Sequence, residues 1–276
     1  DDGLKQPARL TLLCQDLAGY RNLCRLSSRS YLDGHRGERV VIEASWLREH
    51  GEGLIVLAGF QSDIGQCLRE GREEEAGLRL AGWQRDFGDR FYLELTRTGR
   101  SGETEFETGA LPLARQLNCP VVASNDVRFL DKDDCDEHEA RVCIATGRVL
   151  ADPRRPREYT AEQYFKTPEE MAELFADLPG ALENSVQIAM RCNLELSFGT
   201  PYLPQFPVPE GETLDSWITA ESRRGLEQRL DGYPLPAGLD AELAHQHFTH
   251  GHGPTLGKTL VVGLGAQRIG VSFHHR

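Results

Sequence analysis

The 276-residue chain has no long hydrophobic run, no patterned cysteines and no excess of basic residues. Its longest apolar stretches, such as LIVLAGF and TLVVGLGA, fall far short of the roughly 20 residues that a membrane-spanning helix needs. The opening DDGLKQ lacks the basic-then-apolar pattern of a secretion signal. The seven cysteines are scattered without a Cys-x-x-Cys motif, which favours reduced thiols. We therefore predict a cytoplasmic protein with no membrane partner.

The formal net charge is −12, and its distribution is uneven. Residues 231–276 contain equal numbers of acidic and basic side chains, so the whole excess lies in residues 1–230. An acidic body is poorly suited to binding the phosphate backbone of nucleic acids. If the protein serves nucleic-acid chemistry, we expect its basic surface to lie outside this segment.

Strand-like and helix-like patterns alternate over residues 8–146. Each predicted strand is a short apolar run: 9–14, a shorter one at 40–42, then 54–58, 91–95 and 120–124. We expect Asp16 to be the N-cap of a helix that starts directly after it. Further helical patterns cover 44–50, 63–86, 104–117 and 133–146. This alternation predicts parallel strands covered by helices, with chemistry at the loops that follow the strands at 54–58, 91–95 and 120–124.

The chain beyond residue 146 is predicted to be mostly helical. Two capping boxes, Thr160 with Gln163 and Thr167 with Glu170, indicate helix starts. An apolar stripe at helical spacing comprises Leu182, Val186, Ala189 and Met190. The three prolines of 202–212 predict an extended linker, and a further helix is expected at 213–230.

Two polar patterns near the strand at 120–124 are candidate sites. Asp126-x-Arg128 fits either a metal carboxylate with a basic partner or a capped turn in which Arg128 pairs with a nearby acid. Cys135-x-x-His138 could contribute to a zinc site, but zinc needs two further ligands. We therefore favour a buried cysteine and a capping or hydrogen-bonded histidine.

The histidine- and glycine-rich end of the chain offers weaker patterns. It contains four closely spaced imidazoles, those of His245, His247, His250 and His252. They could bind a metal or belong to a flexible tail, and we favour the flexible tail. GPTLGKT at 253–259 misses the spacing of a phosphate-binding loop by one residue, and GLGAQRIG at 263–270 lacks the dinucleotide-binding spacing. Neither predicts a nucleotide site.

Several stretches, in order over residues 8–230, together resemble one known family. They are LTLLCQDLAGYRNLCRLSSRSYLDG (10–34), EGLIVLAGF (52–60), DRFYLELTRTGR (89–100), CPVVASNDVRFLDKDDCDEHEARVCIATG (119–147), YTAEQYFKTPEEMAELFADLPGALENSVQIAMRCN (159–193) and YLPQFPVPEGET (202–213). They resemble the polymerase-and-histidinol-phosphatase (PHP) domain of bacterial DNA polymerase III alpha subunits, replicative polymerases of the C family, and the segment that leads toward the palm.

This resemblance implies an α/β fold, a distorted TIM-like PHP barrel followed by helices and an irregular tail. The domain is expected to be incomplete at its N-terminus, because the family's His-x-His strand and second histidine-bearing strand are not in this sequence. It implies a partial PHP-like domain at 1–200 and a linker and helix toward the palm at 201–231. Residues 232–276 do not resemble the family; a truncated or frame-shifted product, a disordered segment and a divergent tail are the interpretations.

The resemblance also bears on the candidate metal site. In the metal-dependent branch of the family the position of Arg128 is histidine, that of Phe60 is cysteine and that of Thr98 is histidine, so only Asp126 remains as a metal ligand. Arginine carries a permanent positive charge and cannot ligate a cation. We therefore predict a catalytically inert, structural domain without a cofactor, in which Asp126 and Arg128 form an ion pair.

The function implied is a part in the catalytic subunit of template-directed DNA synthesis during chromosome replication. The segment would support the polymerase and dock the proofreading exonuclease subunit, among other replicase subunits. DNA and the Mg²⁺ ions of nucleotidyl transfer would bind in regions outside it. The alternative is a metal-dependent phosphoesterase or 3′–5′ proofreading nuclease. Residues 1–230 contain only His35, His50 and His138, which is too few imidazoles for a multinuclear site.

Overall fold

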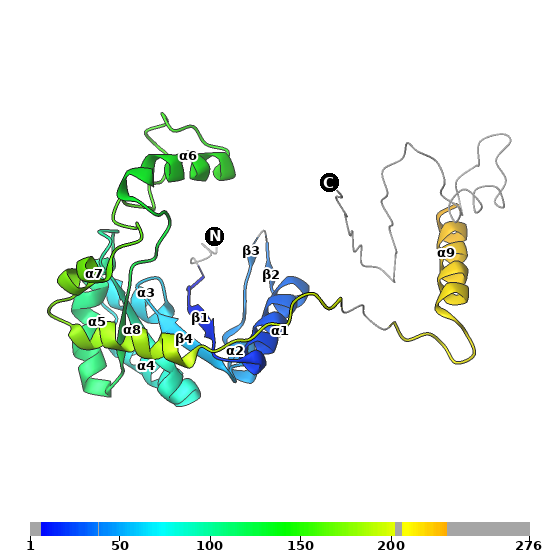
Figure 1. The fold of residues 1–276 in the computed structure, drawn as a ribbon, viewed down its shortest axis with the longest axis horizontal. Helices are drawn as coiled ribbons and strands as arrows, with labels where there is room; N and C mark the ends of the chain where they lie inside the picture. The colour runs from blue at the N-terminus through cyan, green and yellow to red at the C-terminus, as the bar shows by residue number, and fades with distance from the viewer. Residues whose placement is uncertain (1–6, 38, 202–205, 231–276) are drawn as a thin grey trace. The chain divides into compact units, whose positions relative to one another are not determined.

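The structure, a computed structural model, describes residues 7–37, 39–201 and 206–230 (Figure 1). The chain divides into two compact units, Asp1–Phe198 and Gly199–Arg276. The first contains the sheet and its helices. In the second, the described residues form helix α9 (Leu214–Leu230), which confirms the predicted helix at 213–230. No helix among the described residues is long and apolar enough to cross a membrane.

Four strands form the main sheet, in the order β1-β4-β5-β6. Their bounds are β1 Thr11–Cys14, β4 Leu54–Ala58, β5 Phe91–Thr96 and β6 Val121–Ser124. As predicted, β4, β5 and β6 run parallel. Strand β1 is antiparallel to β4, with Cys14 opposite Leu54, because the two intervening helices return the chain to the end at which β1 finished. The expectation of parallel strands is therefore wrong for β1.

The main sheet is open within the described part of the chain, so the expected TIM-like barrel closure is not seen there. Strands β1 and β6 form its two edges. Closing a TIM-type barrel takes eight tilted strands, and four cannot enclose a core. A separate two-stranded ribbon pairs β2 (His35–Arg36) with β3 (Arg39–Val40), close to the short strand predicted at 40–42.

Helices cover both faces of the sheet (Figure 1). In the first unit they are α1 Leu17–Asp33, α2 Ala44–Glu49, α3 Asp63–Arg69, α4 Glu73–Phe87, α5 Glu103–Leu117, α6 Cys135–Thr146, α7 Pro168–Leu174 and α8 Pro179–Arg191. Asp16 caps α1 as predicted, since its Oδ1 accepts a hydrogen bond from the amide of Gly19 at 2.9 Å. Short 3₁₀ turns precede β5 (Gly88–Arg90) and α6 (Lys132–Asp134).

The apolar side chains of the strands alternate between two clusters. Val56, Ala58 and Leu93 lie in the larger one with α3, α4 and α5, whereas Ile55 and Tyr92 lie in the smaller one with Ile188 of α8. Every residue of β4 is buried. The sheet is thus apolar on both faces, as expected for parallel strands covered by helices.

The single helix predicted over 63–86 is in fact two. Helix α3 ends at Arg69 and α4 starts at Glu73. Between them Gly71 adopts φ +72°, a left-handed conformation that glycine reaches at little cost and that ends an α-helix. The break lets α3 and α4 pack against each other.

Only one of the two predicted capping boxes begins a helix. The amide of Glu170 donates to Thr167 Oγ1 at 3.2 Å and the amide of Thr167 donates to Glu170 Oε2 at 2.7 Å, at the start of α7. Thr160 starts no helix, although part of the predicted box forms: its amide donates to Gln163 Oε1 at 3.1 Å. Its hydroxyl accepts from the amide of Glu162 at 3.3 Å and donates to the carbonyl of Thr98, so the box closes a turn next to the β5 loop.

Of the apolar stripe noted on 182–190, only Leu182 packs against the core of the domain. Val186 and Met190 are 57% and 66% exposed, whereas Ala181 and Ile188 are buried. The reason is the packing of α8 against β6, where Asn184 Nδ2 donates to the carbonyl of Val121 at 2.8 Å. This contact turns the Ala181–Ile188 side of the helix toward the sheet.

Candidate functional site: an arginine-filled strand-end cluster

The carboxyl ends of β4, β5 and β6 lie side by side, and the loops that follow them meet at Arg100. Because parallel strands end at the same sheet edge, residues far apart in sequence converge there. Phe60 follows β4, Thr98 and Arg100 follow β5, and Asp126 follows β6. The sequence-predicted positions Phe60, Thr98, Asp126 and Arg128 all belong to this cluster.

The guanidinium group of Arg100 is the centre of the cluster. Its Nη1 lies 2.5 Å from Asp126 Oδ2, and its Nε donates to Thr98 Oγ1 and Glu103 Oε1, each at 3.0 Å. Its Cζ stands 4.7 Å from the ring centroid of Phe60, a cation–π contact. Only 10% of the side chain is exposed. A fixed positive charge therefore lies between the two carboxylates.

Glu103, the first residue of α5, is buried beneath Arg100. Its Oε1 accepts hydrogen bonds from the hydroxyls of Thr96 and Thr98 at 2.7 and 2.8 Å. Its Oε2 accepts from the amides of Thr98 and Arg100 at 2.7 and 3.3 Å. Both oxygens are satisfied by protein groups, which is what a buried carboxylate requires.

Asp126 is held from three sides. Arg128 Nη2 lies 2.7 Å from its Oδ1, so the predicted Asp126–Arg128 ion pair is present. Arg100 and Gln163 Nε2 share its Oδ2, the latter at 3.1 Å. The backbone of Asp126 has φ +42°, which aspartate tolerates better than most residues and which turns the chain directly after β6.

A segment from further along the chain closes one side of the cluster. Gln163, fully buried, also donates to the carbonyl of Asp126 at 3.1 Å, and the amide of Arg128 donates to the carbonyl of Gln163 at 2.8 Å. Asn125 Nδ2 donates to the carbonyl of Tyr164 at 2.7 Å. These bonds hold Asp126 in place.

One further acid lies close to the cluster, on β5. Glu94 accepts a hydrogen bond from Ser124 Oγ at 2.7 Å. Burial raises the pKa of the Glu94 carboxyl above its ordinary value; the Ser124 bond opposes this and the charge of Asp126 adds to it. The carboxylates of Glu103 and Asp126 at this edge of the sheet are thus neutralised by arginines. Within the described ranges, no group of three or more His, Cys, Asp or Glu side chains is placed to hold a metal ion.

Cys135 and His138 lie on α6, away from any second thiol–imidazole pair in the described residues. Cys135 is half-buried. The His138 ring packs against Phe129 and Tyr159, at centroid distances of 5.5 and 4.6 Å, and its buried Nδ1 has no hydrogen-bond partner there. Burial lowers the pKa of His138. The interpretation as a capping or hydrogen-bonded histidine is therefore wrong at Nδ1, because aromatic packing holds the ring.

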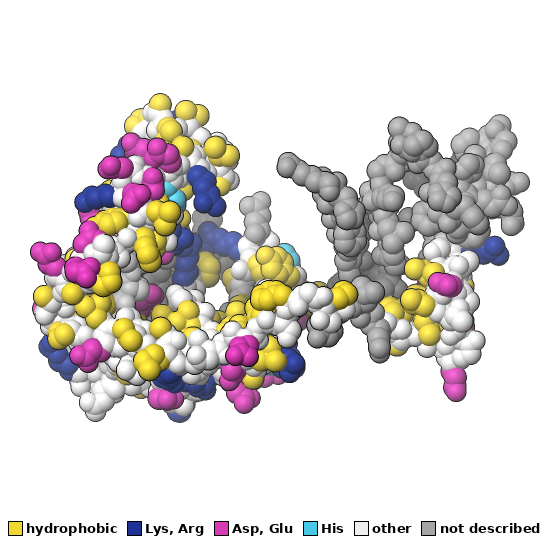
Figure 2. Space-filling view, viewed as in Figure 1, with side chains coloured by type: hydrophobic (Ala, Val, Ile, Leu, Met, Phe, Trp, Pro, Cys, Tyr) yellow, Lys and Arg dark blue, Asp and Glu magenta, His cyan; other side chains and the backbone are white. Residues whose placement is uncertain are grey.

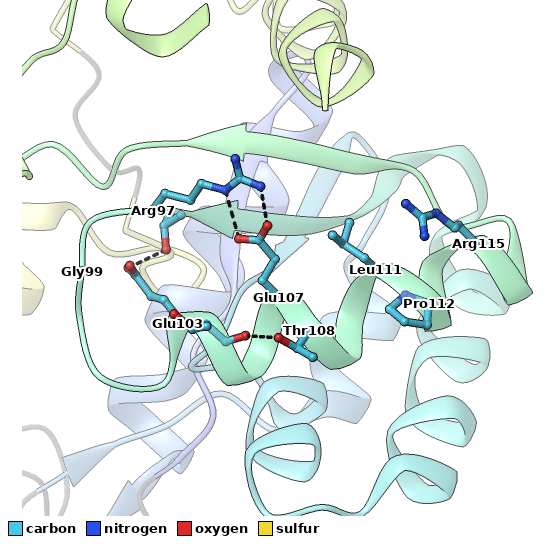
Figure 3. Close-up of a pocket in the computed structure, with 10 residues that line it drawn as sticks. Arg97, Gly99, Glu103, Glu107, Thr108, Leu111, Pro112 and Arg115 are labelled. Atoms are coloured by element: carbon cyan, nitrogen blue, oxygen red, sulfur yellow. Dashed lines mark hydrogen bonds and ion pairs between the residues drawn. The ribbon is translucent and has the colours of Figure 1, made fainter. Parts of the chain in front are cut away.

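A shallow cavity of about 550 Å³ runs along the outer side of α5 (Figure 3). Arg97 lies at one end and Arg115 at the other, with Leu111 between them. Arg97 pairs with Glu107 and, at 2.7 Å, with Asp177, and this contact lowers the pKa of Asp177 to about 2. These groups neutralise one another, so the cavity contains no acid–base pair poised for catalysis. The histidines and glycine motifs of 245–270 lie outside the described residues.

Arg100 and Glu103 were not singled out in the sequence, and Gln163 was named only as part of a predicted capping box, not as part of this cluster. A usable signal existed for two of them: Arg100 and Glu103 are three residues apart at the start of a predicted helix, where an acid commonly binds free backbone amides. Gln163 gave no usable signal, because its role depends on a contact across 37 residues.

Comparison with known protein families shows the class of domain. The family model of the PHP domain matches residues 2–98. Three curated relatives, each named DNA polymerase III subunit alpha, are similar to the chain over most of its length. The protein of Xylella fastidiosa (strain Temecula1) is 53% identical over 237 residues, or 86% of this chain. Those of Pseudomonas aeruginosa and Escherichia coli (strain K12) are 48% and 44% identical over 81% and 80% of it.

The chain therefore contains a PHP domain and is a relative of DNA polymerase III alpha subunits. It spans about a fifth of the length of these relatives: 20% of the Xylella protein and 19% of the other two.

Proposed function

We propose that this chain is the PHP segment of a replicative DNA polymerase's catalytic subunit, and that the segment is a structural, catalytically inert part of it. The observation that carries this proposal is Arg100, whose guanidinium lies between Asp126 and Glu103 at the strand-end edge. A divalent cation placed there would meet two fixed positive charges, Arg100 and Arg128. Coulomb repulsion and the lack of free carboxylate oxygens both oppose metal binding.

The inert role is tested by metal analysis and a hydrolysis assay on the same preparation. The full chain, incubated with Zn²⁺ or Mn²⁺ and then desalted, is expected to retain less than one equivalent of metal. It is also expected to hydrolyse neither a chromogenic phosphodiester nor a 3′-labelled oligonucleotide. Stoichiometric retention of metal together with turnover would instead support the phosphoesterase or nuclease alternative.

Within the larger protein, the proposed activity is template-directed DNA synthesis in the cytoplasm. The carboxylates that bind the two catalytic metals of nucleotidyl transfer, with Mg²⁺ as the expected ion, would lie outside this chain. We expect the 276-residue chain to extend no primer. Adding the remaining four fifths of a relative's sequence should restore extension, and a signal from the purified chain alone would contradict the assignment.

The proposed partner of the segment is the proofreading exonuclease subunit. Large exposed apolar residues on α1, namely Leu17, Tyr20, Tyr31 and Leu32, support a role for this domain in binding other proteins. Co-elution of the chain with purified exonuclease subunit in size-exclusion chromatography is the test. Tyr31→Ser with Leu32→Ser should weaken it, whereas Met190→Ser, at an apolar site on α8 that is 66% exposed like Tyr31, is the matched control.

A further inference from the structure

The helix α6 and the loop after it form a basic arm on an otherwise acidic chain. We define the basic arm as residues 135–157. The part from residue 141 to residue 157 contains five arginines and a single acid, Asp152, although the whole chain carries a net charge of −12. Figure 1 shows α6 standing apart from the sheet and its covering helices. Such a local reversal of charge sign indicates a surface for an anionic partner.

One arginine of the arm is structural. The side chain of Arg155 is 7% exposed, pairs with the buried Glu139 of α6, and donates from Nε to the carbonyl of Leu150 at 3.1 Å. Gly147, at φ +65°, ends α6, and the amide of Arg148 donates to the carbonyl of Cys143 at 2.8 Å. The loop is therefore folded back on the Glu139 side of α6, which places its remaining arginines on one compact unit.

The other arginines of the arm are free to bind. Arg141, Arg148 and Arg157 are exposed, and no ion pair of theirs occurs among residues 7–37, 39–201 and 206–230. Arg154 reaches only Asp152, at 3.3 Å, and its side chain is 89% exposed. The acids of α6 that open the helix, Asp136 and Glu137, lie at its opposite end. In Figure 2, Asp and Glu side chains gather on the left of the arm, and basic side chains are seen on its right.

Several arginines elsewhere in the domain are instead paired with acids. Arg29, Arg48 and Arg79 each pair with an acid across the surface, at 2.9, 2.6 and 2.6 Å. Such pairing neutralises them toward an outside partner. The arm combines several unpaired guanidinium groups, which bind phosphate oxygens in a planar, forked geometry. Phosphates along a DNA strand are spaced about 3.4 Å apart along the axis, so a compact arginine unit can contact several of them.

We propose that the basic arm binds the phosphate backbone of DNA through Arg141, Arg148, Arg154 and Arg157. The binding is electrostatic and independent of base sequence, since guanidinium–phosphate contacts carry no base information. This goes beyond the inert role proposed above and revises the expectation that DNA binds only outside this segment. It does not depend on metal or turnover, so its failure would leave the inert assignment untouched.

The test is fluorescence anisotropy of the full chain with a labelled 30-base-pair duplex over a range of salt concentrations. The wild type should bind at low salt, with an affinity that falls steeply as salt rises. Arg148→Glu with Arg157→Glu should weaken binding at least about tenfold and reduce the slope of log K against log salt by about 2, near 0.9 per lost phosphate contact. Arg115→Glu, at an exposed arginine of α5 with no ion pair in the described residues, is the control and should change neither quantity.

Three results would overturn the proposal. They are no binding by the wild type at low salt, an equal loss in the Arg115→Glu control, and displacement of the DNA by poly-glutamate more readily than by unlabelled duplex of equal charge. The last result would assign the arm to an acidic protein partner. If the double glutamate variant melts at a lower temperature than the wild type, Arg148→Gln with Arg157→Gln repeats the comparison, and an unchanged affinity in that variant also contradicts the proposal.

Discussion

Arg100 Nη1 lies 2.5 Å from Asp126 Oδ2, across 26 residues of sequence and between the ends of two neighbouring parallel strands. The bond joins the loop after β5 to the loop after β6. With Glu103 on its other side, Arg100 connects the three strand-end loops through one largely buried cation. The predictions below follow from this cluster and from the packing that surrounds it.

Replacement of Arg100 by alanine is expected to destabilise the domain. Removing one partner from a buried ion pair leaves the other uncompensated, at a cost of about 3 to 5 kcal/mol. Because Glu103 is buried, we expect the free energy of unfolding, measured by urea denaturation, to fall by an amount in this range. Arg115→Ala on the exposed side of α5 should change the free energy of unfolding by less than about 0.5 kcal/mol. Equal stabilities of the two variants would show that Arg100 is not the centre of the cluster.

Replacement of Arg128 by histidine is expected to create the Asp-x-His pattern without a metal site. Arg100 would still pair with Asp126 Oδ2, and Gln163 would still donate to the same oxygen. Isothermal titration with Zn²⁺ and Mn²⁺ should therefore show no tight, stoichiometric binding. A stoichiometric site in this single variant would mean that Arg128 alone, and not Arg100, excludes metal. The double variant Arg100→Ala with Arg128→His then separates the two charges.

Glu94 is expected to make stability depend on pH in a definite direction. Burial raises the folded pKa of this carboxyl above its unfolded value of 4.5, so the folded state binds the proton more tightly than the unfolded state. The free energy of unfolding that Glu94 contributes should therefore fall as pH rises from below 4.5 through the raised pKa. Glu94→Gln removes this term, so the stability of the variant relative to the wild type should increase from pH 4 to pH 7. A difference that stays constant with pH would contradict this.

Two glycine substitutions should have opposite effects. A Cβ at Gly19 would lie 2.0 Å from the carbonyl oxygen of Gly53, so Gly19→Ala must displace the turn that joins α2 to β4, and a loss of about 3 kcal/mol or more is expected. Gly82 in α4 has nothing within 4 Å of that position. Gly82→Ala should therefore gain about 0.5 to 1 kcal/mol from helix propensity. Thermal melts of both variants make the comparison.

Several features of the fold were predictable because they depend on neighbouring residues alone. The strands at 54–58, 91–95 and 120–124 and the Asp16 cap were predicted close to their observed positions, since apolar runs and capping side chains are local signals. The break between α3 and α4 at Gly71 was missed, because a lone glycine in a helical pattern does not by itself predict a left-handed conformation. The stripe on α8 did not by itself show which face is buried, because the face that a helix buries depends on the strand it meets.

By itself, the sequence determined the alternation of strands and helices and the resemblance to PHP domains, and this resemblance led to the expectation that ligand-type side chains are replaced at Phe60, Thr98 and Arg128. Pairing of Arg128 with Asp126 was also within its reach, since the two lie two residues apart. The role of Arg100 was decided only in three dimensions. Parallel pairing of β5 with β6 brings Glu103 and Asp126 within reach of one guanidinium group, and no local pattern records which charges a sheet edge places together.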